Sequence, residues 1–237
     1  MTRTRTFRRQ MISLVALLLG ALLGTVLASG MVSARAGVTT VTSVTAHASH
    51  AAVATTPRTS RAAFHDQMRK LWEDHVTWTR LAIVTFAAGS AGFDATAARL
   101  LQNQRDIGNA IAPYYGTAAG NRLTALLHDH ITIAVEVLQA AKAGDTAAFT
   151  AADARWYANA NDIADFLAAA NPRSWPRAVM RADMKAHLDQ TLAEAAHELG
   201  GQYAASVTDY EAVHAHILMM ADQLSAGIIA QFPSRFR

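Results

Sequence analysis

One polar pattern occurs twice in this sequence, and it constrains the fold more than any other feature. The segment LWEDHVT at 71–77 returns as LLHDHIT at 126–132, and NQRDIGNAI at 103–111 returns as NANDIADFL at 159–167. A fixed period of this length is typical of a supersecondary unit repeated in tandem. Because the matches fall on polar residues, they are stronger evidence of a repeat than matches at Ala or Leu.

A third copy of the unit is weaker. His187 lies 57 residues after His130, and His214 lies 55 residues after Asn159. We therefore expect tandem helical hairpins, two of them clear from the sequence and the third less so.

From residue 63 onward the sequence is typical of helices. Ala, Leu, Gln, Glu and Arg dominate, and strand-like alternation is absent. Each break carries Gly or Pro, and short connections favour antiparallel neighbours. We predict an all-α fold, an up-and-down bundle of about six helices. The expected helices cover 62–88, 93–112, 117–142, 146–169, 174–199 and 206–231.

The first 36 residues are typical of an export signal. A basic start is followed by a mostly apolar run at 11–34, and Ala-Arg-Ala at 34–36 fits an A-x-A cleavage site. The alternative is an uncleaved membrane anchor, because the apolar run approaches the length that spans a bilayer. Either way we expect an exported protein, extracellular or in the cell envelope, with possible attachment to the membrane through residues 11–34.

Residues 37–62 are a low-complexity mixture of Thr, Ser, Ala and Val, which predicts a flexible linker before a helical-bundle domain at 63–233.

The chain has no cysteine, so disulfides and thiolate metal sites are excluded. Five arginines and no acid lie in the first 36 residues, which leaves 16 basic and 18 acidic residues in the remainder. That part has no excess of positive charge, and we predict no nucleic-acid partner.

Helical spacing points one histidine of each hairpin toward the interior. His75, His130 and His187 each lie on an apolar stripe. We expect a partly buried polar layer, with His on the first helix of each hairpin and Asn or Asp on the second. Its members are His75, Asn103, Asp106, His130, Asn159, Asp162 and His187. The leading interpretation is structural, since paired buried polar groups can fix the register of a bundle rich in alanine.

The first alternative is a site for a metal or a small ligand. Three inward histidines can supply nitrogen ligands to a transition metal, with carboxylates beside them. Two E-x-x-H elements have the spacing found in di-iron bundles, although the other glutamates occur in the wrong order for such a site. The candidate metal ligands are His75, His130, His187, Glu194, His197, Glu211 and His214. A copper site from His214, His216, Met219 and Met220 is a further option.

The second alternative is an enzyme that uses a buried His–Asp pair as general base. The residues to consider are at 74, 75, 106, 129 and 130. No nucleophile elbow, phosphate loop, dinucleotide fingerprint or H-E-x-x-H motif is present in the sequence. The sequence therefore favours a protein that is not an enzyme and assigns no catalytic residue.

Four segments resemble a family of uncharacterised exported bacterial helical-bundle proteins. They are LWEDHVTWTR, RWYANANDIADFL, the segment from His187 to Glu194, and HILMMAD at 216–222. The resemblance covers most of residues 68–233. It implies a helical fold and an exported bacterial setting, and it transfers no catalytic residue. Together these observations predict a binding or scaffold module of the cell envelope.

Overall fold

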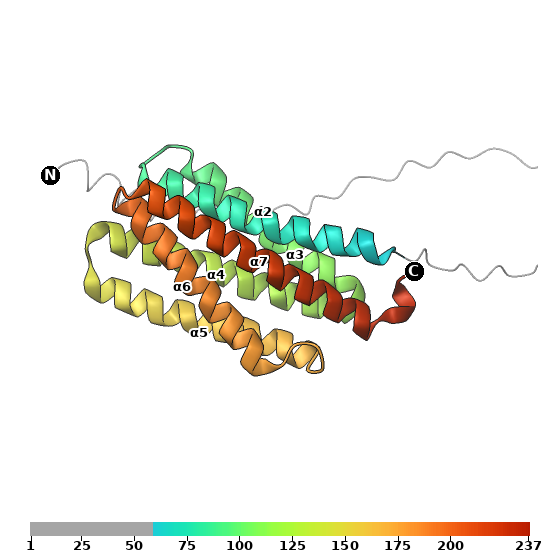
Figure 1. Cartoon of the computed structure of the whole chain (residues 1–237). Helices are drawn as coiled ribbons and strands as arrows, with labels where there is room; N and C mark the ends of the chain where they lie inside the picture. Colours follow the sequence, from blue (N-terminus) through green and yellow to red (C-terminus); the bar gives the residue numbers. More distant parts are fainter. Residues whose placement is uncertain (1–58) are drawn as a thin grey trace, which may run out of the picture. The chain divides into compact units, whose positions relative to one another are not determined.

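The computed structural model describes residues 59–237, and within them it is an all-α bundle (Figure 1). The predicted export signal, the membrane anchor and most of the predicted linker lie outside these residues. The helices are α2 (Arg61–Ala87), α3 (Phe93–Tyr115), α4 (Thr117–Ala143), α5 (Thr146–Ala170), α6 (Arg177–Leu199) and α7 (Tyr203–Gln231), followed by a 3-10 helix, η1 (Pro233–Arg235). The predicted fold class is confirmed.

Two of the helix ends that differ from the predicted ones are the start of α2, which is set by its N-cap, and the end of α3, which is set by the backbone conformation of a glycine. α2 begins at Arg61 because the Ser60 hydroxyl accepts a hydrogen bond from the Ala63 amide at 3.0 Å, as an N-cap does. α3 does not stop before Pro113, which lies in its last turn. It ends instead at Tyr115 and is followed by Gly116, whose φ of 90° only glycine adopts easily.

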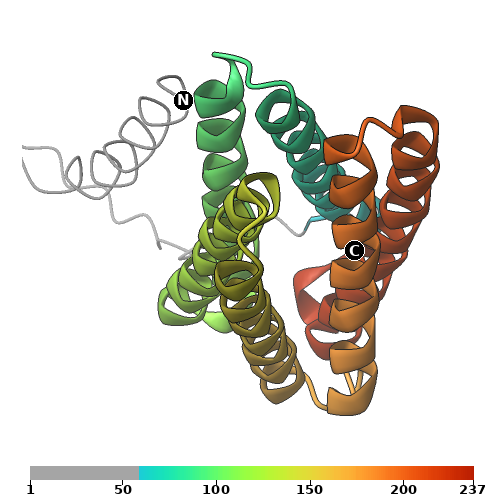
Figure 2. The ribbon, with the colours of Figure 1, turned by 90° about the vertical axis from the view of Figure 1, so that its left-hand side faces the viewer.

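The six helices form a closed ring of antiparallel neighbours. Each helix packs against the next along the chain, and α7 packs back against α2 (Figures 1 and 2). The first helices of the hairpins also meet across the interior, since α6 contacts both α2 and α4. The hairpins are α2–α3, α4–α5 and α6–α7, so residues on α2, α4 and α6 can converge.

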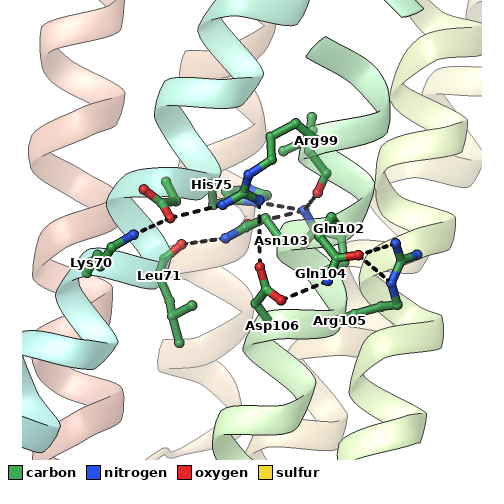
Figure 3. Close-up of polar contacts among 11 residues, drawn as sticks. Lys70, Leu71, His75, Arg99, Gln102, Asn103, Gln104, Arg105 and Asp106 are labelled. Atoms are coloured by element: carbon green, nitrogen blue, oxygen red, sulfur yellow. Dashed lines mark hydrogen bonds and ion pairs between the residues drawn. The ribbon is translucent and has the colours of Figure 1, made fainter. Parts of the chain in front are cut away.

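The first two hairpins are joined by the same side-chain hydrogen bond. The Asn103 amide on α3 donates to the Leu71 carbonyl on α2 at 2.9 Å (Figure 3). The Asn159 amide on α5 donates to the Leu126 carbonyl on α4 at 3.0 Å. In both hairpins the acceptor lies four residues before the inward histidine, so the sequence repeat is also a repeat of geometry.

The third hairpin has an equivalent bond, from a residue that the sequence comparison did not select. His216 on α7 donates through Nε2 to the carbonyl of Asp183 at 3.0 Å, and Asp183 lies four residues before His187. The expected counterpart, His214, contacts Glu73 instead. The prediction of His214 was wrong because it placed the third copy 55 residues after Asn159. His187 lies 57 residues after His130, and the same shift of 57 from Asn159 leads to His216.

The C-terminal residues extend the bundle beyond residue 233. Phe236 is buried against Phe64 and Tyr114, with ring centroids 5.1 and 5.4 Å away. The Arg237 amide donates to the Thr59 carbonyl at 3.2 Å. The last residues of the chain therefore cover the end of the core beside the start of α2.

One helix within the described residues, α7, is long and apolar enough to cross a membrane by length and composition. It packs in the bundle between α2 and α6. Its inward residues Val213, Ile217, Met220 and Leu224 belong to the core, which accounts for much of its apolar composition.

Glycine permits a close crossing of α3 and α4. A Cβ atom at Gly120 would lie 2.7 Å from the Gly108 carbonyl oxygen and 2.9 Å from the Ala112 Cβ. A Cβ atom at Gly108 would lie 2.0 Å from the Thr124 hydroxyl oxygen. These two helices can approach this closely only where both positions lack a side chain.

We expect Gly120→Ala to destabilise the bundle by about 2 kcal/mol or more, because the new methyl group forces the two backbones apart. Urea unfolding followed by circular dichroism measures this. Gly92→Ala is the matched control, since its Cβ meets only the Ser90 hydroxyl at 3.4 Å, and we expect a change within about 0.5 kcal/mol. Equal effects from the two variants would contradict the tight crossing.

Candidate functional site

The three inward histidines meet in the centre of the bundle. The ring centroid of His187 lies 5.8 Å from that of His75 and 6.1 Å from that of His130. Each side chain is at most 4% exposed. The first helices of the three hairpins thus bring together residues that are more than 50 positions apart in the sequence.

Two of the rings have amide partners. His130 donates through Nδ1 to the Asn159 side-chain oxygen at 3.0 Å. The Gln104 amide nitrogen donates to Nδ1 of His75 at 3.4 Å, and both residues are visible in Figure 3. The predicted pairing of a layer histidine with Asp or Asn across a hairpin therefore occurs at His130, with Asn159. The His–Asp pair of the enzyme alternative does not occur at these rings, because their partners are neutral amides.

Most of the remaining ring nitrogens are unpaired. Nδ1 of His187 is buried without a hydrogen-bond partner. Within residues 59–237, no partner is found for Nε2 of His130 or of His187 either, whereas the ring of His75 also has a hydrogen bond with the Asn103 side chain. Buried polar atoms normally have partners, because leaving one unpaired costs about 1–3 kcal/mol. The histidine layer therefore leaves several hydrogen-bonding positions to be filled from elsewhere.

A cavity of about 50 Å³ lies against these rings. All three histidines line it, together with the hydroxyl-bearing residues Thr79 and Thr191. The other lining side chains come from α2 to α6 and are apolar, apart from the indole N–H of Trp156, which is buried without a partner among the described residues. No Asp, Glu, Lys or Arg is among them. The space is large enough for roughly three to five water molecules or a small ligand.

Burial keeps the three imidazoles neutral. It lowers the pKa of His75 to about 3, assisted by the nearby His130. Burial also lowers the pKa of His130 to about 4. The pKa of His187 lies well below its ordinary value because of burial and of the surrounding histidines. Neutral rings offer both lone pairs and N–H groups to the cavity.

These pKa values predict that acid destabilises the fold. The unfolded chain binds protons at the three histidines below pH 6.5. In the folded chain His130 and His75 stay neutral down to about pH 4, and the pKa of His187 is also well below that of the unfolded chain. Glu194 acts in the opposite direction, because burial raises its pKa to about 7 and the folded chain retains that proton. The net difference of about two protons should lower the free energy of unfolding by about 2–3 kcal/mol per pH unit between pH 6 and 5.

Urea unfolding at several pH values tests this dependence. Glu194→Gln removes the carboxyl group that keeps its proton in the folded chain. The difference in bound protons between the unfolded and folded chains should then rise to about three, so the free energy of unfolding should fall more steeply with decreasing pH. A free energy of unfolding that stays flat from pH 6.5 to 5 would show that the histidines are not held neutral.

The structure places two predicted members of the layer outside it. Asp106 is half-buried at the flank, where it accepts from Gln102 at 2.9 Å and lies 3.6 Å from Arg99 (Figure 3). Asp162 is exposed. Both predictions were wrong for the same reason: a carboxylate is costly to bury beside neutral rings, so it stays near cations or water.

The predicted carboxylate–histidine metal ligands do not share a site. Glu194 is buried and contacts Arg80, whereas His197 lies at the partly exposed edge and donates to Asp209 at 2.5 Å. Glu211 is exposed. Within residues 59–237, no three His, Asp or Glu side chains are placed to hold one metal ion. The E-x-x-H spacing aligns each pair on its own helix but does not bring the two pairs together.

A buried ionic cluster was missed by the sequence analysis. Arg80 on α2 lies 3.2 Å from Glu194 and 3.1 Å from Glu198 on α6, and it also contacts Ser206 on α7. Ser206 donates to Glu198 at 2.8 Å. Glu194 and Glu198 lie four residues apart, which places them on one helix face. That spacing was the available signal, but nothing in the sequence indicated an arginine from α2.

Comparison with protein-family models, curated proteins and solved structures finds no match to the chain. The resemblance to an exported bacterial family therefore stays a prediction. The function has to be inferred from the site itself.

Proposed function

We propose that this chain is an exported binding protein of the cell envelope that holds a small neutral ligand inside its helical bundle. The observation that carries the proposal is the cavity at the histidine layer, where the buried Nδ1 of His187 and Nε1 of Trp156 have no partner within residues 59–237. A site that is mostly apolar, with a few convergent polar groups, has the usual composition of a ligand pocket. Export rests on the N-terminal sequence alone.

An enzyme is less well supported. Asp74 lies with Lys70 and Arg99 at the edge of the bundle rather than beside His75. The neighbours of the buried rings are amides, and no Ser or Lys lines the cavity. The cavity offers a general base, but its lining has neither a nucleophile nor a charged group that could position a substrate. These residues therefore indicate no class of reaction.

A purely structural layer is the competing interpretation. It accounts for Asn103 and Asn159, whose amides join the hairpins. It does not account for a cavity left beside three histidines, because a layer selected only for packing is expected to be filled. The cavity therefore favours binding over a structural role alone.

Xenon under pressure is a suitable first probe, because it fills apolar cavities without needing a hydrogen bond. We expect saturable changes in the amide and methyl NMR signals of residues around the cavity, such as Ile131. Ala195→Leu should abolish them, since Ala195 lines the cavity and the larger side chain occupies the space.

The matched control is Ala205→Leu, a substitution at a position near the start of α7 that does not line the cavity. It should leave the xenon response unchanged. No xenon response in the wild-type chain, or an equal response in Ala195→Leu, would show that the interior has no space that a ligand can enter.

A further inference from the structure

The hydrogen-bond partners of two histidines determine what each ring presents to the cavity. Nδ1 of His75 lies 3.4 Å from the Gln104 amide nitrogen, which is equally close to the Asn103 side-chain oxygen. Because a ring nitrogen that faces an N–H group accepts, the N–H of His75 is on Nε2. His130 donates from Nδ1 to the Asn159 oxygen, so its Nε2 carries a lone pair. The two rings that each contact His187 therefore supply one hydrogen-bond donor and one acceptor.

The backbone fixes the orientation of both amides. The Gln104 amide nitrogen donates to the Leu100 carbonyl at 2.7 Å, and the Asn159 amide nitrogen donates to the Leu126 carbonyl at 3.0 Å. Turning either amide over would place its oxygen against a carbonyl oxygen. The two tautomers are thus set by the helices and not by the ligand.

The threonine hydroxyls extend the polar side of the cavity as acceptors. Thr79 donates to the His75 carbonyl and Thr191 to the His187 carbonyl, both at 2.8 Å. Each hydroxyl proton is therefore already used, and only the oxygen lone pairs remain. His187 adds one N–H and one lone pair, since neither of its ring nitrogens has a partner within residues 59–237. The indole N–H of Trp156, also without a partner there, is a further donor.

Size and charge limit the ligand further. The cavity is about 50 Å³, roughly a third of an engineered cavity that admits benzene, so it takes about two to four heavy atoms. No charged side chain lines it. A charged ligand would enter without a counter-charge, which is costly in an apolar interior.

We propose that the ligand is a small alcohol, with its hydroxyl group against the three histidine rings and its short carbon chain in the apolar part of the cavity. A hydroxyl group both donates and accepts, which matches the two rings. This inference rests on the proposed function and names the chemical class of its ligand.

A transition metal suits the site less well. A metal takes a lone pair from every ring, whereas His75 presents an N–H at Nε2. Metal binding is therefore an outcome that would overturn the proposal, and the experiment includes it.

Three probes of the same size separate the possibilities in the wild-type, full-length chain. 2-Propanol donates and accepts a hydrogen bond, acetone only accepts, and isobutane does neither. We expect NMR titration to give saturable binding of 2-propanol at least about tenfold tighter than that of acetone or isobutane. With four heavy atoms, its Kd is expected to be no tighter than about 0.05 mM.

Substitution of the acceptor ring gives a second test. His130→Phe should weaken 2-propanol about tenfold while xenon still binds, which also reports that the cavity is intact. If this variant does not fold, His75→Phe replaces it and removes the donor instead. His197→Gln is the control, because His197 pairs with Asp209 away from the cavity, and it should leave the Kd unchanged.

The outcomes distinguish this inference from the proposed function. Xenon binding with no preference for 2-propanol would overturn the alcohol and leave the binding function standing. Stoichiometric binding of Co²⁺ or Zn²⁺ that is lost in His130→Phe would replace the alcohol by a metal. Failure of both xenon and 2-propanol to bind would remove both proposals.

Discussion

The interior of this bundle depends on one hydrogen bond that occurs in each hairpin. A side chain on the second helix donates to the carbonyl four residues before the inward histidine, from Asn103, Asn159 or His216. The bond fixes the register of the two helices, so the three histidines arrive at the same level. An alanine-rich helix surface specifies register weakly, and a polar contact at one level supplies what apolar packing does not.

The cavity and the neutral rings follow from that arrangement. Three imidazoles at one level cannot pair with one another at every nitrogen, and they are too deeply buried to be charged. Asn159 and Gln104 satisfy one nitrogen each and thereby set the tautomers of His130 and His75. The nitrogens left over border an apolar space, which gives the interior the character of a binding site.

Much of the fold could be predicted because it depends on local signals. Helical spacing placed His75, His130 and His187 inward, and the repeat identified Asn103 and Asn159. What could not be predicted depends on side-chain contacts between helices. The Arg80–Glu194–Glu198 cluster joins α2 to α6, which are distant in sequence, and Gln104 contacts His75 within the first hairpin. The choice of His214 over His216 failed because a sequence shift of two residues rotates a helical side chain to another face.

The electron density inside the cavity tests the central claim most directly. A high-resolution crystal structure of the protein, purified without chelators or added alcohols, would show whether the space beside the histidines is filled. We predict density within hydrogen-bonding distance of Nε2 of His75 and of His130, from a bound molecule or from ordered water in its place. Rings rotated so that their nitrogens bond to one another around an empty, collapsed space would contradict the account.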